Sequence, residues 1–218
     1  MPEPEKTKLS RREREREQHR QEILDAAEAM FSSKGIAEVT IEDVAKKADF
    51  AVGSIYNFFG GKEDLVHQVM LRLATWRVDE IESSVLPIQD KPVDALKMLT
   101  HLWFSHHTKH GAFLRVVFHS NLLSGKRPGE PCENPDMRLQ MKRYETAICK
   151  FFESGVKAGV FQKLDPQHLM LMFEGICRSF LFASRWTHDT RPKQELEDEL
   201  FAAVHAAITG HLFERPRL

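Results

Sequence analysis

Apolar residues recur along most of this chain at intervals of three and four positions, the spacing of one face of an α-helix. No segment shows the sustained alternation of apolar and polar residues that is typical of a β-strand. Glycines and prolines separate the periodic segments where helices would end. We therefore predict an all-α protein of about nine helices, near residues 18–34, 41–48, 52–59, 62–81, 93–108, 113–123, 135–156, 166–186 and 194–213.

The second predicted helix has a well-defined start. Thr40 stands at the N-cap position, and Asp43 is placed to complete a capping box with it. The apolar positions that follow lie at i, i+3, i+4 and i+7, so one face can be buried while the charged residues stay in water. The pattern ends at Asp49, which leaves a short helix followed by a turn.

The third predicted helix, residues 52–59, presents a small polar face. Ile55 and Phe59 share one side, whereas Gly53, Ser54 and Asn57 point largely away from it. No acidic residue lies between positions 50 and 61, so nothing in this segment repels phosphate. A slim helix with hydrogen-bonding groups is what the DNA major groove admits. The two helices therefore predict a helix-turn-helix DNA reader.

The fourth predicted helix opens with Lys62 directly after a Gly-Gly pair. Its ammonium and the free N–H groups of the helix start can bind one phosphate together. For two of the aromatic residues before this helix we expect different roles. Phe59 is expected in the core beside Ile55, whereas Tyr56 is compatible with either the core or a phosphate contact.

Three consecutive motifs resemble the DNA-binding domain of the TetR/AcrR family of transcriptional regulators. They are Thr40-Ile41-Glu42-Asp43-Val44-Ala45, then Gly53-Ser54-Ile55-Tyr56-Asn57-Phe58-Phe59, then Lys62-Glu63-Asp64-Leu65. The resemblance implies that Tyr56 and Lys62 contact phosphates, that Thr40 lies at the DNA backbone, and that Val52, Gly53 and Asn57 face the bases. It implies a homodimer that binds double-stranded operator DNA and a small-molecule effector.

Three positions depart from the usual pattern of that family. Asp49 stands where a turn glycine is common, Ala51 where Ser or Thr usually caps the third helix, and Gly60-Gly61 where polar or basic residues are frequent. Aspartate can adopt the left-handed conformation at some cost, so the turn should form. Loss of the cap hydroxyl should cost about 1 kcal/mol of local stability. We expect these departures to change the affinity for DNA rather than the function of the protein.

The N-terminal 17 residues are expected to form a flexible charged arm, ahead of a DNA-binding domain at 18–64. Residues 11–20 carry an alternating run of charges. This run fits two interpretations: a solvated, frayed extension of the first helix, or a basic arm that contacts DNA. The net charge of −1 excludes a general polyanion binder but not a reader with one locally positive face.

Residues 65–218 are expected to form a larger effector-binding and dimerisation domain. By resemblance, the last two helices pair with their copies in a four-helix bundle. The interface residues we predict are Leu169, Phe173, Ile176, Phe180, Leu200, Val204, Ile208 and Leu212. A pocket for a small, apolar effector is expected among Trp103, Phe104, Phe113, Val117, Phe118, Met141, Tyr144, Ile148, Met172 and Phe173, although each of these residues also suits an ordinary core.

No catalytic motif is present, and we predict neither an enzyme nor a cofactor. His106 and His110 share a helical face, but an exposed face explains them better than a metal. The three cysteines lack metal-ligand spacing and, with no signal peptide or membrane-length apolar run, favour the cytoplasm. The alternative to a ligand-released repressor is a helical ligand carrier or a protein-binding adaptor without specific DNA binding.

Overall fold

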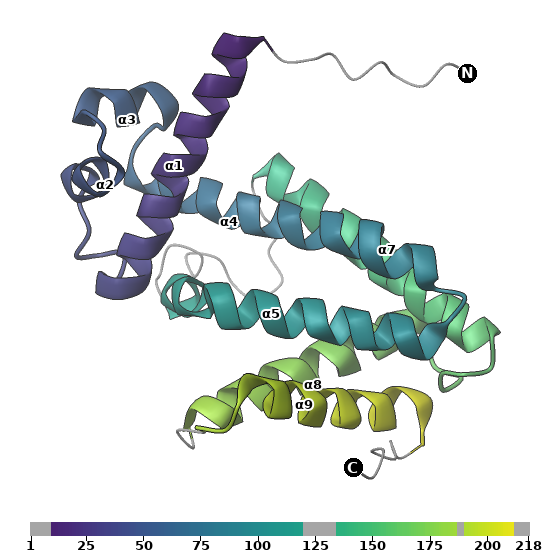
Figure 1. Ribbon diagram of the computed structural model, residues 1–218. Coiled ribbons are helices and arrows are strands. Elements are labelled where there is room, and N and C mark those ends of the chain that lie inside the picture. Colours follow the sequence, from purple (N-terminus) through teal and green to yellow (C-terminus); the bar gives the residue numbers. More distant parts are fainter. Residues whose placement is uncertain (1–9, 120–133, 187–189, 212–218) are drawn as a thin grey trace. The chain divides into compact units, whose positions relative to one another are not determined.

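The computed structural model describes residues 10–119, 134–186 and 190–211, and within these ranges it is built from helices without a β-strand (Figure 1). The all-α prediction is confirmed. The α-helices are α1 (Arg11–Lys34), α2 (Ile41–Ala48), α3 (Val52–Phe58), α4 (Lys62–Glu80), α5 (Pro92–His119), α7 (Pro135–Lys157), α8 (Pro166–Trp186) and α9 (Lys193–Thr209). A π-helical turn, Ile81–Val85, and a 3₁₀ turn, Leu86–Ile88, follow α4.

Several helix ends differ from the sequence-based expectation. α1 begins at Arg11 rather than near residue 18, because Ser10 and Glu13 form a capping box that fixes its first turn. α9 ends at Thr209, where Gly210 adopts the left-handed conformation at the C-cap. The sequence predicts separate helices at 93–108 and 113–123, but α5 runs through Gly111 without a break.

Gly111 fails to end α5 because burial outweighs its low helix propensity. A glycine inside a helix costs about 1 kcal/mol relative to alanine. Gly111 is itself buried, and Phe113 and Leu114 just after it are buried as well. Continuing the helix through the glycine therefore gains more from packing than a break would.

The chain forms two compact units, each of which we describe separately. The first contains residues 1–72 and 112–130, and the second contains residues 73–111 and 131–218. Both α4 and α5 contribute to each unit, since the divisions fall after Arg72 and after Gly111. The predicted domain boundaries at residues 17 and 64 stay predictions.

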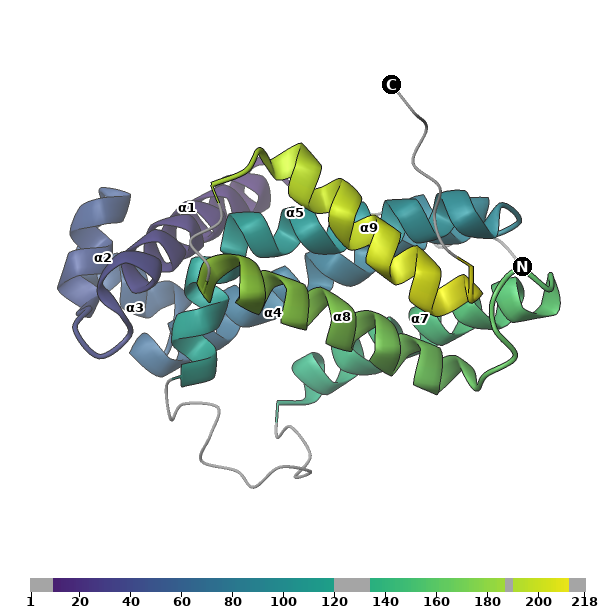
Figure 2. The same cartoon turned by 90° about the horizontal axis from the view of Figure 1, so that it is seen from below.

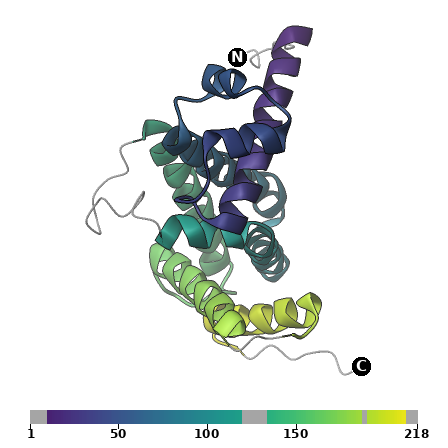
Figure 3. The same cartoon turned by 90° about the vertical axis from the view of Figure 1, so that its left-hand side faces the viewer.

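The first unit packs α1 against α2, with α3 following α2 after a short turn (Figure 3). Its core includes Ile23, Phe31, Val44 and Ile55, which are all fully buried. The ring of Phe31 stacks on that of Phe113, with centroids 6.3 Å apart. The short helices α2 and α3 are therefore held on a rigid base.

The second unit is organised around α8, which packs on α7 and on α9 (Figure 2). Phe151, Phe152, Phe161 and Phe173 form the centre of its core. Close packing there explains Gly155, since a Cβ at this position would stand 2.0 Å from Cδ2 of Phe161. No helix among the described residues has the length and apolarity to span a bilayer.

Candidate nucleic-acid interface

The capping box at the start of α2 forms as predicted. The Thr40 side-chain oxygen accepts a hydrogen bond from the Asp43 backbone N–H at 3.1 Å, and the Thr40 backbone N–H donates to the Asp43 carboxylate at 3.1 Å. The hydrogen bond from the Thr40 backbone N–H, and a second one that the Thr40 hydroxyl donates to the same carboxylate at 3.1 Å, lower the pKa of Asp43. The capping box thus satisfies the N–H groups of Thr40 and Asp43, and it fixes the residue at which α2 begins.

The turn between α2 and α3 depends on Asp49, which has φ 60° and ψ 42°. It is the one residue other than glycine with a positive φ in the part of the chain that the structure describes. Ala51, at the N-cap of α3, supplies no side-chain hydrogen bond. The two departures from the family pattern therefore leave the turn intact but cost some stability on each side of it.

α3 has one buried side and one exposed side. Ile55 is fully buried and Phe59, at its C-cap, is 2% exposed, which confirms Phe59 as a core residue. Gly53, Tyr56 and Asn57 are exposed, and Tyr56 keeps 55% of its surface in solvent. Val52 and Ser54 are half-buried. The exposure of Tyr56 favours a contact outside the chain over a core role.

Lys62 lies at the start of α4 with its ammonium directed to the loop before α2. Its Nζ donates hydrogen bonds to the carbonyl oxygens of Ala37, at 3.3 Å, and Val39, at 3.1 Å. An ammonium has three N–H donors. One donor is thus left for a phosphate while the other two secure the loop that leads to the N-cap Thr40.

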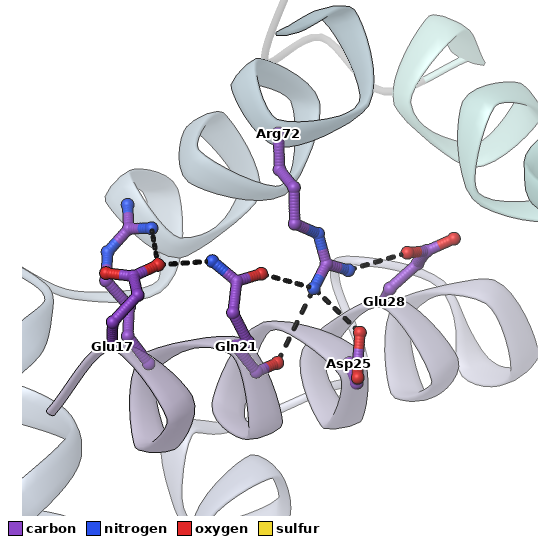
Figure 4. A network of polar contacts seen from close by, with 6 residues as sticks. Glu17, Gln21, Asp25, Glu28 and Arg72 are labelled. Carbon is purple, nitrogen blue, oxygen red and sulfur yellow. Dashed lines mark hydrogen bonds and ion pairs between the residues drawn. The ribbon is translucent and has the colours of Figure 1, made fainter. Parts of the chain in front are cut away.

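Arg72 ties α4 to α1 within the first unit (Figure 4). Its guanidinium forms ion pairs with Asp25 at 2.7 Å and Glu28 at 2.9 Å, and a hydrogen bond of 3.2 Å with the Gln21 side chain. The side chains of Arg72 and Glu28 are only 20% and 14% exposed. This network holds the part of α4 up to Arg72 against α1, the helix on which α2 packs.

The predicted effector-pocket residues are divided between the two units. Phe113 and Val117 are buried in the first unit, whereas Trp103, Phe104, Ile148 and Phe173 are buried in the core of the second. Tyr144 and Met172 pack against that second core. Met141 is 58% exposed, so it does not line a pocket within this chain. The side chain of Phe118 lies outside the described residues.

The second unit holds a cluster of aromatic and histidine side chains that the sequence does not predict. His106 is expected on an exposed face, but it is only 4% exposed and its ring stacks on Trp76, with centroids 5.3 Å apart. His107 stacks on Trp103 at 3.8 Å. The one signal in the sequence is the i, i+3 and i+4 spacing of Trp103, His106 and His107, which places the three rings on one side of α5.

Burial keeps both histidines of this cluster neutral. Desolvation lowers the pKa of His106 to about 3, with a smaller contribution in the same direction from His107. Desolvation also lowers the pKa of His107 to about 4. Within the described residues, Nε1 of Trp103 has no hydrogen-bond partner, and neither ring nitrogen of His106 makes a hydrogen bond of normal geometry, although the nearby Leu73 backbone slightly opposes the lowering of the His106 pKa. No group of three potential metal-ligating side chains occurs in the same ranges.

Arg77, Tyr144 and Glu174 form a second polar group in the same unit. The guanidinium of Arg77 lies 3.9 Å from the centroid of the Tyr144 ring, and the Tyr144 hydroxyl donates to Glu174. Desolvation raises the pKa of Tyr144 well above its ordinary value. These contacts link α4, α7 and α8 through polar side chains.

The residues predicted for the dimer interface are mostly core residues. Five of them are fully buried within the chain and have no surface left to contact a second copy: Leu169, Phe173, Leu200, Val204 and Ile208. Ile176 and Phe180 are half-buried, and Leu212 lies outside the described residues. The exposed side of α8 instead carries a shallow apolar groove lined by Leu171, Met172, Gly175, Ile176, Ser179 and Phe180.

The fold and the exposed α3 face define a helix-turn-helix protein with a separate helical C-terminal part. The family model described as bacterial regulatory proteins, tetR family, matches residues 23–69. A second model, for the tetracyclin repressor-like C-terminal domain, matches residues 92–211. The chain therefore belongs to the TetR family.

Curated relatives match over part of the chain. The transcriptional repressor KstR2 of Mycobacterium tuberculosis (strain H37Rv) is 31% identical over 74 residues, which are 32% of this chain and 37% of KstR2. The match thus spans well under half the length of that relative. The transcriptional regulator YhgD of Bacillus subtilis (strain 168) is 27% identical over 154 residues, or 66% of this chain and 73% of YhgD.

Solved structures share the whole fold at lower identity. A TetR-family transcriptional regulator from Mesorhizobium loti MAFF303099 has a TM-score of 0.66 and 23% identity, and the match covers 88% of this chain and 95% of that one. The fatty acid degradation regulator FadR from Bacillus halodurans has a TM-score of 0.66 and 20% identity, covering 84% and 93%. At these identities the likeness concerns the fold.

Proposed function

We propose that this protein is a dimeric, sequence-specific transcriptional repressor that leaves its operator when a small, apolar molecule binds its second unit. The observation that carries the proposal is the exposed side of α3, where Gly53, Tyr56 and Asn57 face solvent while Ile55 anchors the helix. Membership of the TetR family and the repressor KstR2 among its relatives support it.

In this proposal the residues of the first unit divide into two roles. Tyr56, Lys62 and Thr40 contact the DNA backbone, and Val52, Gly53 and Asn57 face the base edges. The absence of a side chain at Gly53 lets the helix approach the groove closely, and the Asn57 amide offers both donors and an acceptor to a base. Ser54 is half-buried and stands at the edge of this face.

Dimerisation is assigned to the exposed side of α8. Leu171 is 62% exposed and borders the groove around Gly175 and Ile176, where the missing side chain of Gly175 permits a close approach. An exposed apolar surface of this kind is typical of a protein–protein contact. A two-fold symmetric pair would place two α3 helices on two half-sites.

The effector is assigned to the neighbourhood of Trp103 and His106. Their buried ring nitrogens offer two N–H donors and one acceptor, and the surrounding rings supply an apolar wall. α4 carries Trp76 of this cluster and, at its other end, Lys62. Because one helix carries both residues, a ligand that displaces Trp76 can also displace Lys62. A coupling free energy of about 1–3 kcal/mol between effector binding and DNA binding is enough to change operator occupancy.

Selection of DNA from a random-sequence library tests the proposal against every candidate operator at once. Repeated binding and amplification with the full-length protein should enrich a pseudo-palindrome whose half-sites lie about one helical turn or more apart. A ligand carrier or a protein-binding adaptor would enrich no sequence, and that outcome would refute the repressor. Screening apolar metabolites for release of the enriched duplex then identifies the effector.

A further inference from the structure

The N-terminal turns of α1 form an ordered helix that continues beyond the core of the first unit. Ser10 accepts a hydrogen bond from the Glu13 backbone N–H at 3.2 Å, and its own N–H donates to the Glu13 carboxylate at 2.7 Å. Figures 1 and 3 show these turns running beside α3 and extending past it. Residues 11–19 are all exposed. The segment therefore holds its side chains in fixed directions without being part of the core.

One face of this segment points toward α3. The buried Ile23 lies on the same helical stripe as His19, Arg16 and Arg12, which precede it by four, seven and eleven positions. The His19 ring contacts that of Phe50, just before α3, with centroids 5.2 Å apart. The guanidinium of Arg16 lies 5.7 Å from the ring centroid of Phe58, the last residue of α3. Arg12 and Arg16, which we call the arginine stripe, therefore begin next to α3 and continue from there toward the N-terminal end of α1.

The acidic residues of the segment are occupied elsewhere. Glu13 caps the helix, Glu15 pairs with Arg11 at 2.8 Å, and Glu17 lies 3.8 Å from Arg20. Arg12 and Arg16 form no ion pair with any residue that the structure describes. The stripe therefore presents two uncompensated positive charges on the side of α1 nearest to α3.

We propose that Arg12 and Arg16 are a second DNA-binding surface, which contacts backbone phosphates flanking the bases read by α3. The proposal rests on the proposed function, because α3 must dock in the groove to bring the stripe to the DNA. The contact of Arg16 with Phe58 holds its side chain in place and so reduces the entropy lost on binding. Phosphate contacts carry no sequence information, so the pair adds affinity without changing the preferred operator.

The test compares three double variants of the full-length protein on the duplex enriched by the wild type. Arg12→Gln with Arg16→Gln removes the stripe. Arg11→Gln with Arg14→Gln removes the same charge from other faces of the same helix. Arg12→Lys with Arg16→Lys keeps both positive charges but replaces each guanidinium with an ammonium group. Binding is measured by fluorescence anisotropy over a series of salt concentrations, and thermal unfolding is recorded for each variant.

Loss of two phosphate contacts in each protomer of a dimer should make the slope of log Kobs against log salt concentration less negative by about 3.6. We expect this for the stripe variant, a change of less than half that size for the Arg11 and Arg14 variant, and a near wild-type slope for the lysine variant. All should enrich the same sequence.

Equal slope changes in the two glutamine variants would overturn the proposal, because bulk charge would then explain them. An unchanged slope in the stripe variant, with or without a lower melting temperature, would overturn it too and leave these arginines a structural role on Phe58. Failure of the repressor itself is recognised separately, since the wild type would then select no sequence.

Discussion

Gly53 shows how a single residue separates stability from function. It lies exposed in α3, and a Cβ built there meets no atom within 4 Å. We predict that Gly53→Ala stabilises the protein by up to about 1 kcal/mol, because alanine favours the helix. The same methyl group would hold the helix away from the base edges, so operator affinity should fall by about tenfold or more. Thermal unfolding and anisotropy titration check the two halves of the prediction; unchanged affinity would show that α3 does not enter the groove at this residue.

His106 gives the protein an acid sensitivity that its sequence does not reveal. Its pKa is about 3 when folded, against about 6.5 when unfolded, so the unfolded chain binds the extra proton. The stabilising effect is complete above pH 6.5 and is lost as the pH falls below that value toward 3. At pH 5 we expect a loss of about 2 kcal/mol relative to pH 7 from this residue.

Replacing His106 isolates this contribution to the pH dependence. His106→Phe should flatten the decline in unfolding free energy between pH 7 and pH 5, whereas His168→Gln, at an exposed position of α8, should leave it unchanged. Urea denaturation at each pH supplies the free energies. An equally steep decline in the His106→Phe variant would contradict a neutral buried imidazole.

At the scale of elements, the capping box of α2 determines where the helix-turn-helix begins. Thr40→Ala removes the hydroxyl that accepts from the Asp43 N–H, which costs about 1 kcal/mol. For a chain of this size, that loss lowers the melting temperature by about 2–4 °C. Calorimetry checks the shift, with Thr146→Ala on an exposed face of α7 as the control. Equal melting temperatures for the Thr40 variant and the wild type would mean that the box contributes nothing.

The sequence predicts elements that depend on neighbouring residues well, and it predicts burial by distant residues poorly. Thr40, Asp43 and Asp49 act on their immediate neighbours, so local patterns place α2, its turn and α3 correctly. Phe113, which follows Gly111, and His106 stack on residues distant in sequence, Phe31 and Trp76, and periodicity alone does not reveal those partners. For α8 the apolar stripe is real, but Leu169 and Phe173 face the core rather than a second chain.

At the scale of the whole molecule, the proposed function requires two copies, and the groove on α8 is where we expect them to meet. Leu171→Glu with Ile176→Glu would place charges in this apolar contact, so we predict a monomer in sedimentation velocity and loss of operator binding. Leu139→Glu alters a leucine on α7 that is 56% exposed and should remain a dimer. A dimer in the α8 variant would move the interface to another face.

The DNA-reading role of the exposed side of α3 is central to the proposed function, and one titration tests it most directly. Fluorescence anisotropy compares the wild type, an Asn57→Ala and Tyr56→Phe double variant, and Thr146→Ala on the enriched duplex and on a scrambled one. We predict that the wild type and Thr146→Ala bind the enriched duplex tightly and that the double variant loses about 1–3 kcal/mol of binding free energy, about 5- to 150-fold in affinity, with little difference left between the two duplexes. Selective binding by the double variant at wild-type affinity would contradict a reading role for α3.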